Sequence, residues 1–137
     1  MEDDPDTRFA MTLLFELEGF EVITATDGQD AYLKAQVQQP DVIITDINMP
    51  NVSGLDLIRL IRGDGKLAGI PIVAMSAVEK QYLNRAKELG ASAVCQKPIE
   101  FDQIIALIAQ IFSARHRRNR SQVDRRRASR RNDGQAT

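Results

Sequence analysis

Residues 41–54 read DVIITDINMPNVSG, and this stretch decides the fold of the chain. Val42, Ile43 and Ile44 form a continuous apolar run, which is typical of a strand that is covered on both faces. Asp46 stands at the carboxyl end of this run. The stretch therefore predicts a buried strand of a parallel sheet that carries an aspartate to the sheet edge.

The rest of the chain alternates between short apolar runs and segments with a helical period. The other predicted strands are Glu21–Thr26, Ile70–Met75 and Ser92–Gln96. Apolar stripes with helical spacing are found at residues 9–17, 54–61 and 101–112, with weaker ones at 31–35 and 79–89. Gly19 and Gly90 stand where helix C-caps are expected, just before strand runs. This alternation predicts a parallel sheet with helices on both faces.

The composition is that of a globular protein, with 43% hydrophobic and 27% charged residues among 137. The single cysteine, Cys95, excludes an internal disulfide and a cysteine zinc cluster. The single histidine, His116, argues against a Ser-His-Asp triad or a multi-histidine metal site. No apolar run approaches the ~20 residues of a membrane span, and the acidic amino terminus lacks a signal-peptide pattern. We therefore expect a cytoplasmic protein.

The charge is divided between two regions of opposite sign. Residues 1–114 carry 9 basic and 17 acidic residues, a balance of −8, whereas residues 115–137 carry 9 arginines and 2 aspartates, a balance of +7. We predict a folded domain over residues 1–114 and a basic, disordered tail over residues 115–137. The tail has no aromatic residue for base stacking, so any binding of nucleic acid by it would be weak and non-specific. Folding back onto the acidic domain is a further alternative for the tail.

Groups with reactive side chains fall where the predicted strands end or the chain begins: Glu2, Asp3, Asp4, Asp46, Ser76 and Lys97. Because the carboxyl ends of parallel strands meet at one edge, we expect these groups to converge. Crowded carboxylates repel one another unless a cation joins them, and oxygen ligands suit Mg²⁺. A carboxylate can also act as a nucleophile and form an acyl phosphate, whose oxygens an ammonium and a hydroxyl would stabilise.

Four segments, EDDPDTR, DVIITDINMPNVSG, IPIVAMSA and GASAVCQKPI, resemble in order and spacing the receiver domain of two-component response regulators. The resemblance covers roughly residues 1–114. It implies a flavodoxin-like, doubly wound parallel sheet of five strands in the order 2-1-3-4-5. It also implies that Asp46 accepts a phosphoryl group from a sensor histidine kinase or a phosphotransfer protein, and that the domain signals to a downstream protein by direct contact. The domain would then be a switch rather than a metabolic enzyme.

The resemblance assigns the site residue by residue. The implied Mg²⁺ ligands are Asp3, Asp46, the backbone carbonyl of Asn48 and, through water, Glu2. The implied phosphoryl contacts come from Ser76 and Lys97, and Ala77 is the small residue that leaves the phosphoryl group room. The peptide bond between Lys97 and Pro98 is expected to be cis.

Two features depart from the family pattern. The family often has Tyr or Phe three residues before the lysine, whereas Val94 stands here, so the usual aromatic switch cannot operate. The family's central first strand precedes the acidic pair, whereas only Met1 precedes Glu2. Such a strand contributes about 5–10 kcal/mol of burial, compared with about 5–15 kcal/mol of net stability for a domain. We therefore expect a truncated first strand, with the true start upstream or the strand lost, and a marginal or unfolded chain.

Two alternatives to phosphorylation-dependent switching stay open, and the two departures favour the first of them. One is an interaction module of the same fold that works without phosphorylation. The other is nucleic-acid binding through the arginine-rich tail.

Overall fold

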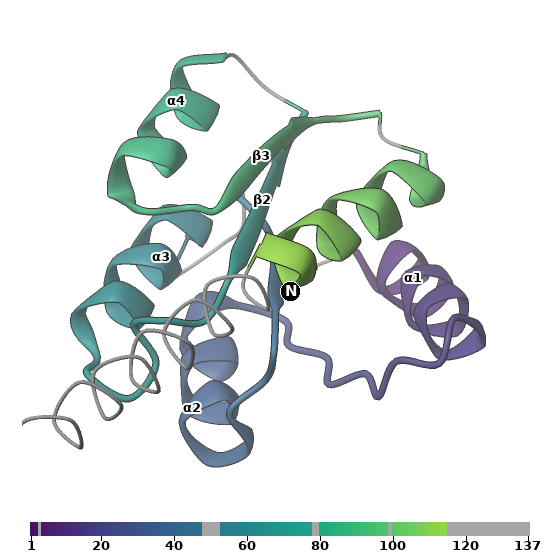
Figure 1. Cartoon of the computed structure of the whole chain (residues 1–137), viewed down its shortest axis with the longest axis horizontal. Coiled ribbons are helices and arrows are strands. Elements are labelled where there is room, and N and C mark those ends of the chain that lie inside the picture. The colour runs from purple at the N-terminus through teal and green to yellow at the C-terminus, as the bar shows by residue number, and fades with distance from the viewer. Residues whose placement is uncertain (3, 48–52, 78–79, 99, 115–137) are drawn as a thin grey trace, which may run out of the picture. The chain divides into compact units, whose positions relative to one another are not determined.

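The computed structural model describes residues 1–114, apart from residues 3, 48–52, 78–79 and 99. The chain divides between Ile104 and Ile105 into two units, and the following description concerns the first of them. The order of its elements is α1 (Pro5–Leu17), α2 (Gly28–Gln38), β1 (Ile43–Asp46), α3 (Gly54–Gly63), β2 (Ile72–Ser76), α4 (Lys80–Leu89) and β3 (Ala93–Gln96) (Figure 1). Residues 101–114 are also helical and cross the boundary between the units.

The three strands form a parallel sheet in the order β1-β2-β3. Asp46 pairs with Met75, and Met75 pairs with Cys95, so the carboxyl ends of all three strands lie at one edge. Every residue of β2 is buried, as its position between two strands and two helical layers requires. The predicted strands at residues 41–46, 70–75 and 92–96 are therefore confirmed, with small differences at their ends.

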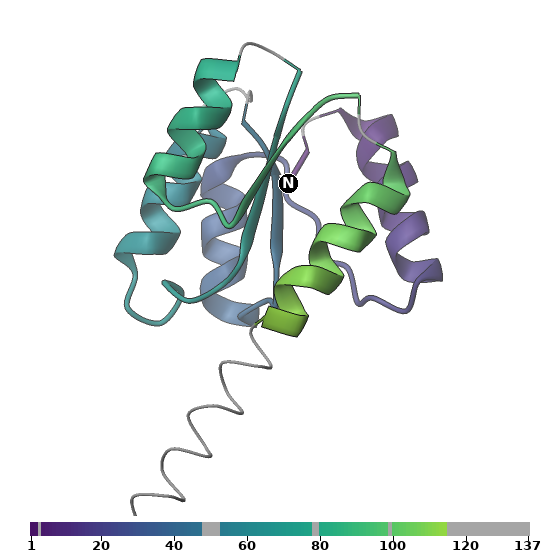
Figure 2. The same ribbon diagram turned by 45° about the horizontal axis from the view of Figure 1, so that its top comes forward.

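Helices lie on both sides of the sheet, as the alternation of elements predicted (Figures 1 and 2). Helix α4 packs against β2, β3 and α3, and α2 packs against α3. Helix α3 begins at a capping box, in which the Ser53 hydroxyl accepts from the Asp56 N–H and the Asp56 carboxylate accepts from the Ser53 N–H. Its inner face, with Leu57, Ile58 and Ile61, is completely buried. These contacts fix α3 beside the end of β1.

Helix α1 lies on the other side of the sheet from α3 and α4 (Figure 2). Asp4 caps it by accepting a hydrogen bond from the Thr7 N–H, and Pro5 occupies its first turn. Its buried residue is Phe15, whose ring meets those of Phe20 and Phe101 edge to face. The apolar stripe from Phe9 to Leu17 correctly predicted a helix, but its residues are exposed in the structure.

Two glycines end helices as predicted. Gly19 has φ 92° and Gly90 has φ 115°, a region that favours glycine because it has no Cβ. In the described part of the chain, none of the helices has the length and apolar character needed to cross a bilayer.

Residues 21–26 do not form a strand, contrary to the prediction. Within the described part of the chain, this segment makes one hydrogen bond to the backbone of another segment. In that bond the Glu2 N–H donates to the Ala25 carbonyl at 3.3 Å. On the other side, the Met1 amine donates to the Ile44 carbonyl and the Asp46 N–H donates to the Met1 carbonyl, at 3.1 Å. Backbone hydrogen bonds from Met1 and Glu2 thus bridge β1 and residues 21–26, although neither residue belongs to a strand.

Two residues offer too few backbone partners to order a neighbouring strand, because each strand residue needs its N–H and C=O paired. The described sheet therefore has three strands, and the five-stranded order 2-1-3-4-5 is not observed in it. The predicted low stability of the chain stays a prediction.

Candidate functional site

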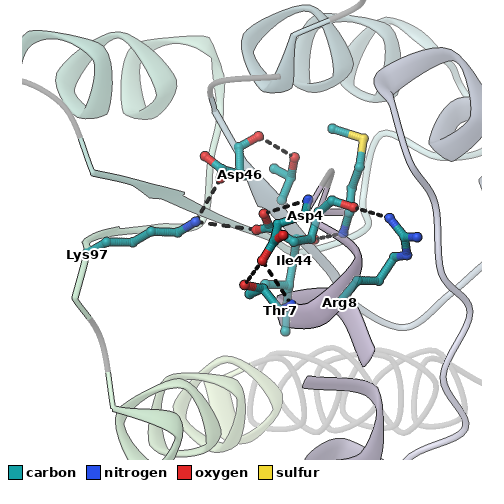
Figure 3. A network of polar contacts seen from close by, with 9 residues as sticks. Asp4, Thr7, Arg8, Ile44, Asp46 and Lys97 are labelled. Carbon is teal, nitrogen blue, oxygen red and sulfur yellow. Dashed lines mark hydrogen bonds and ion pairs between the residues drawn. The ribbon is translucent and has the colours of Figure 1, made fainter. Parts of the chain in front are cut away.

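Lys97 joins two buried carboxylates at the carboxyl edge of the sheet (Figure 3). Its Nζ lies 2.7 Å from Oδ2 of Asp46 and 3.3 Å from Oε2 of Glu2. The side chains of Asp46 and Glu2 are only 10% and 8% exposed, whereas that of Lys97 is 28% exposed. One ammonium therefore compensates two carboxylates that little water can reach.

The parallel register explains why residues 51 positions apart meet here. Asp46 ends β1, Ser76 ends β2, and Lys97 follows β3 directly. Ser76 pairs with Gln96, and the Ser76 carbonyl accepts a hydrogen bond from the Lys97 N–H at 2.8 Å. Ser76 is fully buried at the same edge as Asp46. The predicted convergence of Glu2, Asp46 and Lys97 is thus observed, with Ser76 on the strand between.

Charge and burial act in opposite directions on the ionisable groups. Burial raises the pKa of the Glu2 carboxyl, and the nearby charge of Lys97 offsets this rise only in part. Burial also acts to lower the pKa of Lys97, but the hydrogen bond and charge of Asp46, followed by those of Glu2, outweigh it and leave that pKa raised. Lys97 therefore stays protonated at neutral pH and keeps its positive charge beside Asp46.

The amino terminus holds the Glu2 carboxylate in place through contacts that the sequence did not predict. Nη1 of Arg8 donates to the Glu2 carbonyl at 3.0 Å, and the Asp4 N–H donates to Oε1 of Glu2 at 3.3 Å (Figure 3). The Met1 amine is buried, and this burial lowers its pKa from 8.0 to about 6. No sequence signal indicated these contacts, because Arg8 and Glu2 show no distinctive spacing.

Several predicted site residues fall outside the described part of the chain, namely Asp3, Asn48 and the arginine-rich tail. Within the part that is described, no three His, Cys, Asp or Glu side chains form a group that could hold a metal ion. Glu2 and Asp46 nevertheless supply carboxylate oxygens close to a single cationic atom, and oxygens of this kind suit Mg²⁺. The described residues therefore supply two carboxylates of a kind that suits a divalent cation.

Two features around Lys97 follow the expectations from sequence. The peptide bond between Lys97 and Pro98 is cis. Val94 is half-buried and packs against the core, so an aliphatic side chain fills the position at which the resemblance often places an aromatic ring.

Comparison with known proteins gives a consistent result. Residues 1–109 match the family described as response regulator receiver domain. The chain is 34% identical over 96 residues to the polar-differentiation response regulator DivK of Brucella anthropi. The matched region covers 69% of this chain and 78% of that protein. It is 33% identical over 117 residues to the sensor protein EvgS of Escherichia coli O157:H7. This matched region covers 84% of the chain but only 10% of EvgS.

Other relatives and solved structures agree. The DNA-binding response regulator MtrA of Mycolicibacterium smegmatis is 29% identical over 120 residues, and the chain spans half of its length. The N-terminal domain of a Wolinella succinogenes protein has a TM-score of 0.76 at 31% identity, covering 85% of this chain and 94% of that one. Chemotaxis protein CheY4 of Vibrio cholerae has a TM-score of 0.74 at 27% identity, covering 80% and 92%.

Proposed function

The chain belongs to the response regulator receiver domain family, and from this premise we propose that Asp46 accepts a phosphoryl group and thereby switches the domain. The contact between the Lys97 ammonium and the Asp46 carboxylate, at 2.7 Å, carries the proposal. It places a permanent positive charge where the oxygens of a phosphoryl group on Asp46 would lie. A buried carboxylate with such a partner is poised to act as a nucleophile.

The proposed reaction transfers the phosphoryl group in line. An oxygen of Asp46 forms a bond to phosphorus while the bond from phosphorus to the donor histidine nitrogen breaks, and its electron pair stays on that nitrogen. Lys97 exchanges its contact with the carboxylate for one with a phosphoryl oxygen, and the Ser76 hydroxyl donates to another. Water later hydrolyses the acyl phosphate and restores the carboxylate.

Mg²⁺, when bound, would neutralise charge between the carboxylates and the phosphoryl oxygens. Asp46 and, through water, Glu2 would hold it within the described part of the chain, together with Asp3 and the Asn48 carbonyl. The position of Glu2 beside Lys97 supports this assignment, because a buried carboxylate needs cationic neighbours.

The proposed donor is a phosphohistidine on a sensor kinase or a phosphotransfer protein, and the proposed output is contact with a downstream protein. Relatives that include both a sensor protein and response regulators support such a phosphorelay. We place the switching domain in residues 1–114 and the basic tail in residues 115–137, in the cytoplasm. Its only chemistry would be gain and loss of its own phosphoryl group, without turnover of a metabolite.

Labelling with acetyl phosphate tests the proposal. The wild-type chain should acquire one phosphoryl group in the presence of Mg²⁺, and Asp46→Asn should abolish the label. Asp41→Asn, at an exposed position five residues earlier, is the matched control and should label like the wild type. Equal labelling of Asp46→Asn and the wild type would contradict the proposal.

A second candidate function is partner binding without phosphorylation, which Val94 favours. An aliphatic residue packed against the core cannot report the state of Asp46 by turning a ring outward. A wild-type chain that is folded and binds its partner but takes up no label would establish this alternative.

A further inference from the structure

We propose that Thr45 and Gly54 are positioning residues for the phosphoryl transfer, because they fix the backbone carbonyl from which the Asp46 side chain projects. The inference rests on the proposed function of Asp46.

Thr45 supplies a buried hydroxyl within an otherwise apolar strand. Its side chain is fully buried, and Oγ1 donates a hydrogen bond to the Asp46 carbonyl at 2.9 Å. Valine would fill nearly the same volume and would suit a buried strand better, because it carries no polar group to desolvate. The hydroxyl therefore serves the bond to the Asp46 carbonyl rather than the packing of the strand.

Gly54, the first residue of α3, lies close to the same carbonyl. A Cβ at this position would lie 2.3 Å from the Asp46 carbonyl oxygen and 2.7 Å from the Ile47 Cα, distances that no real contact permits. Its N–H also donates to the Ile47 carbonyl at 3.1 Å. The positive φ that often explains a glycine is not the reason here; the reason is the close approach of two backbones.

The strain of an added methyl group would have to be shared between α3 and the Asp46 backbone. Helix α3 is held by its capping box and by three completely buried side chains, Leu57, Ile58 and Ile61. The groups in conflict are backbone atoms, which cannot turn aside as the end of a side chain can. The peptide that follows Asp46 must therefore move as well.

Movement of this peptide reaches the reacting atoms at once. The Asp46 carboxyl carbon is three bonds from the carbonyl carbon, and its oxygen must stay 2.7 Å from the Lys97 ammonium to keep the observed pair. A displacement of about 1 Å in a reacting group can cost about 100-fold in rate. Thr45 and Gly54 thus act on the reaction through Asp46.

Two matched pairs of variants test the inference, with the rate of labelling by acetyl phosphate and the urea midpoint measured for each. Gly54→Ala should label about 10- to 100-fold more slowly than the wild type. Gly63→Ala makes the same change at the other end of α3, where a Cβ would meet nothing within 4 Å, and it should label at the wild-type rate. If Gly54→Ala fails to fold, the second pair decides.

In the second pair, Thr45→Val should label about fivefold more slowly, the factor that corresponds to one net hydrogen bond. Thr45→Ser keeps the hydroxyl and should restore the rate. If the wild type is labelled, and the folded Gly54→Ala and Thr45→Val chains are labelled as fast as the wild type, the inference is wrong but the proposed function stands. A folded wild type without label would overturn the proposed function and this inference together.

Discussion

Replacing Lys97 by methionine is expected to destabilise the chain, because it leaves two buried carboxylates without their shared cation. At an effective dielectric constant of about 20, the attraction across 2.7 Å to Asp46 is about 6 kcal/mol before desolvation is counted. Desolvation and the partial exposure of Lys97 offset most of this attraction. We therefore expect a net coupling of about 1–3 kcal/mol between Lys97 and Asp46.

A double-mutant cycle measures this coupling. The four chains are the wild type, Lys97→Met, Asp46→Asn and the double variant, each unfolded by urea and followed by circular dichroism. Lys97→Met should cost less stability in the Asp46→Asn background than in the wild type, because one of the unpaired carboxylates is already gone. A stabilising osmolyte can be added equally to all four chains to bring their transitions into range.

The exposed pair of Lys34 and Asp30, at 3.1 Å and with side chains 41% and 34% exposed, provides the control cycle. An i,i+4 surface pair of this kind should show a coupling of about 0.3–0.5 kcal/mol. A Lys97–Asp46 coupling no larger than that of the control would refute the reasoning, because burial would then add nothing to the pair.

Further predictions concern the amino terminus, Arg62 and the basic tail. Burial lowers the pKa of the Met1 amine from 8.0 to about 6, so the unfolded chain binds more protons between these pH values. The free energy of unfolding should therefore fall by about 2 kcal/mol as the pH falls from 8 to 6. Acetylation of the amine keeps an N–H donor and should remove this dependence of stability on pH. The raised pKa of Glu2 acts in the opposite direction, because it makes the free energy of unfolding fall as the pH rises above about 4.5, and Glu2→Gln should remove that effect. The Arg62 guanidinium donates to the carbonyls of Ala68, Ile70 and Gly90, so Arg62→Met should lower the free energy of unfolding in urea by about 2 kcal/mol. Arg59→Met breaks only an exposed ion pair and should lower it by under about 0.5 kcal/mol. Equal losses for the two variants would show that the three carbonyl bonds of Arg62 add no stability. Replacing the arginines of residues 115–137 by glutamine should leave phosphoryl labelling unchanged and abolish any low-salt retention on DNA, so retention that persists would exclude the tail as its source.

The period of the apolar residues was sufficient to predict most of the fold. The continuous apolar run from Val42 to Ile44 predicted β1, in which Ile43 and Ile44 are half-buried and the last two residues are buried. Residues 21–26 have the same local character but form no strand, because a strand depends on a partner that local sequence does not encode. The stripe at Phe9 correctly predicted a helix, but its periodicity does not say what covers that face, and in the structure the face is exposed.

The site was predictable where it depends on strand ends and less so where it depends on close packing. Asp46 and Lys97 meet because parallel strands bring their carboxyl ends to one edge of the sheet, and this rule can be applied to the sequence alone. The hydrogen bond of Thr45 and the contact of Gly54 with the Asp46 carbonyl depend on how closely α3 approaches β1. Sequence gives the residue types at these positions but not that distance.

Direct mapping of the phosphoryl group tests the central claim. After treatment with acetyl phosphate and Mg²⁺, hydride reduction converts an aspartyl phosphate to homoserine with release of phosphate, and peptide mass spectrometry then locates the change. We expect homoserine at position 46 in the treated chain and none when Mg²⁺ is removed by a chelator. Homoserine at another aspartate, or an unmodified Asp46 in a folded and fully treated chain, would contradict the claim.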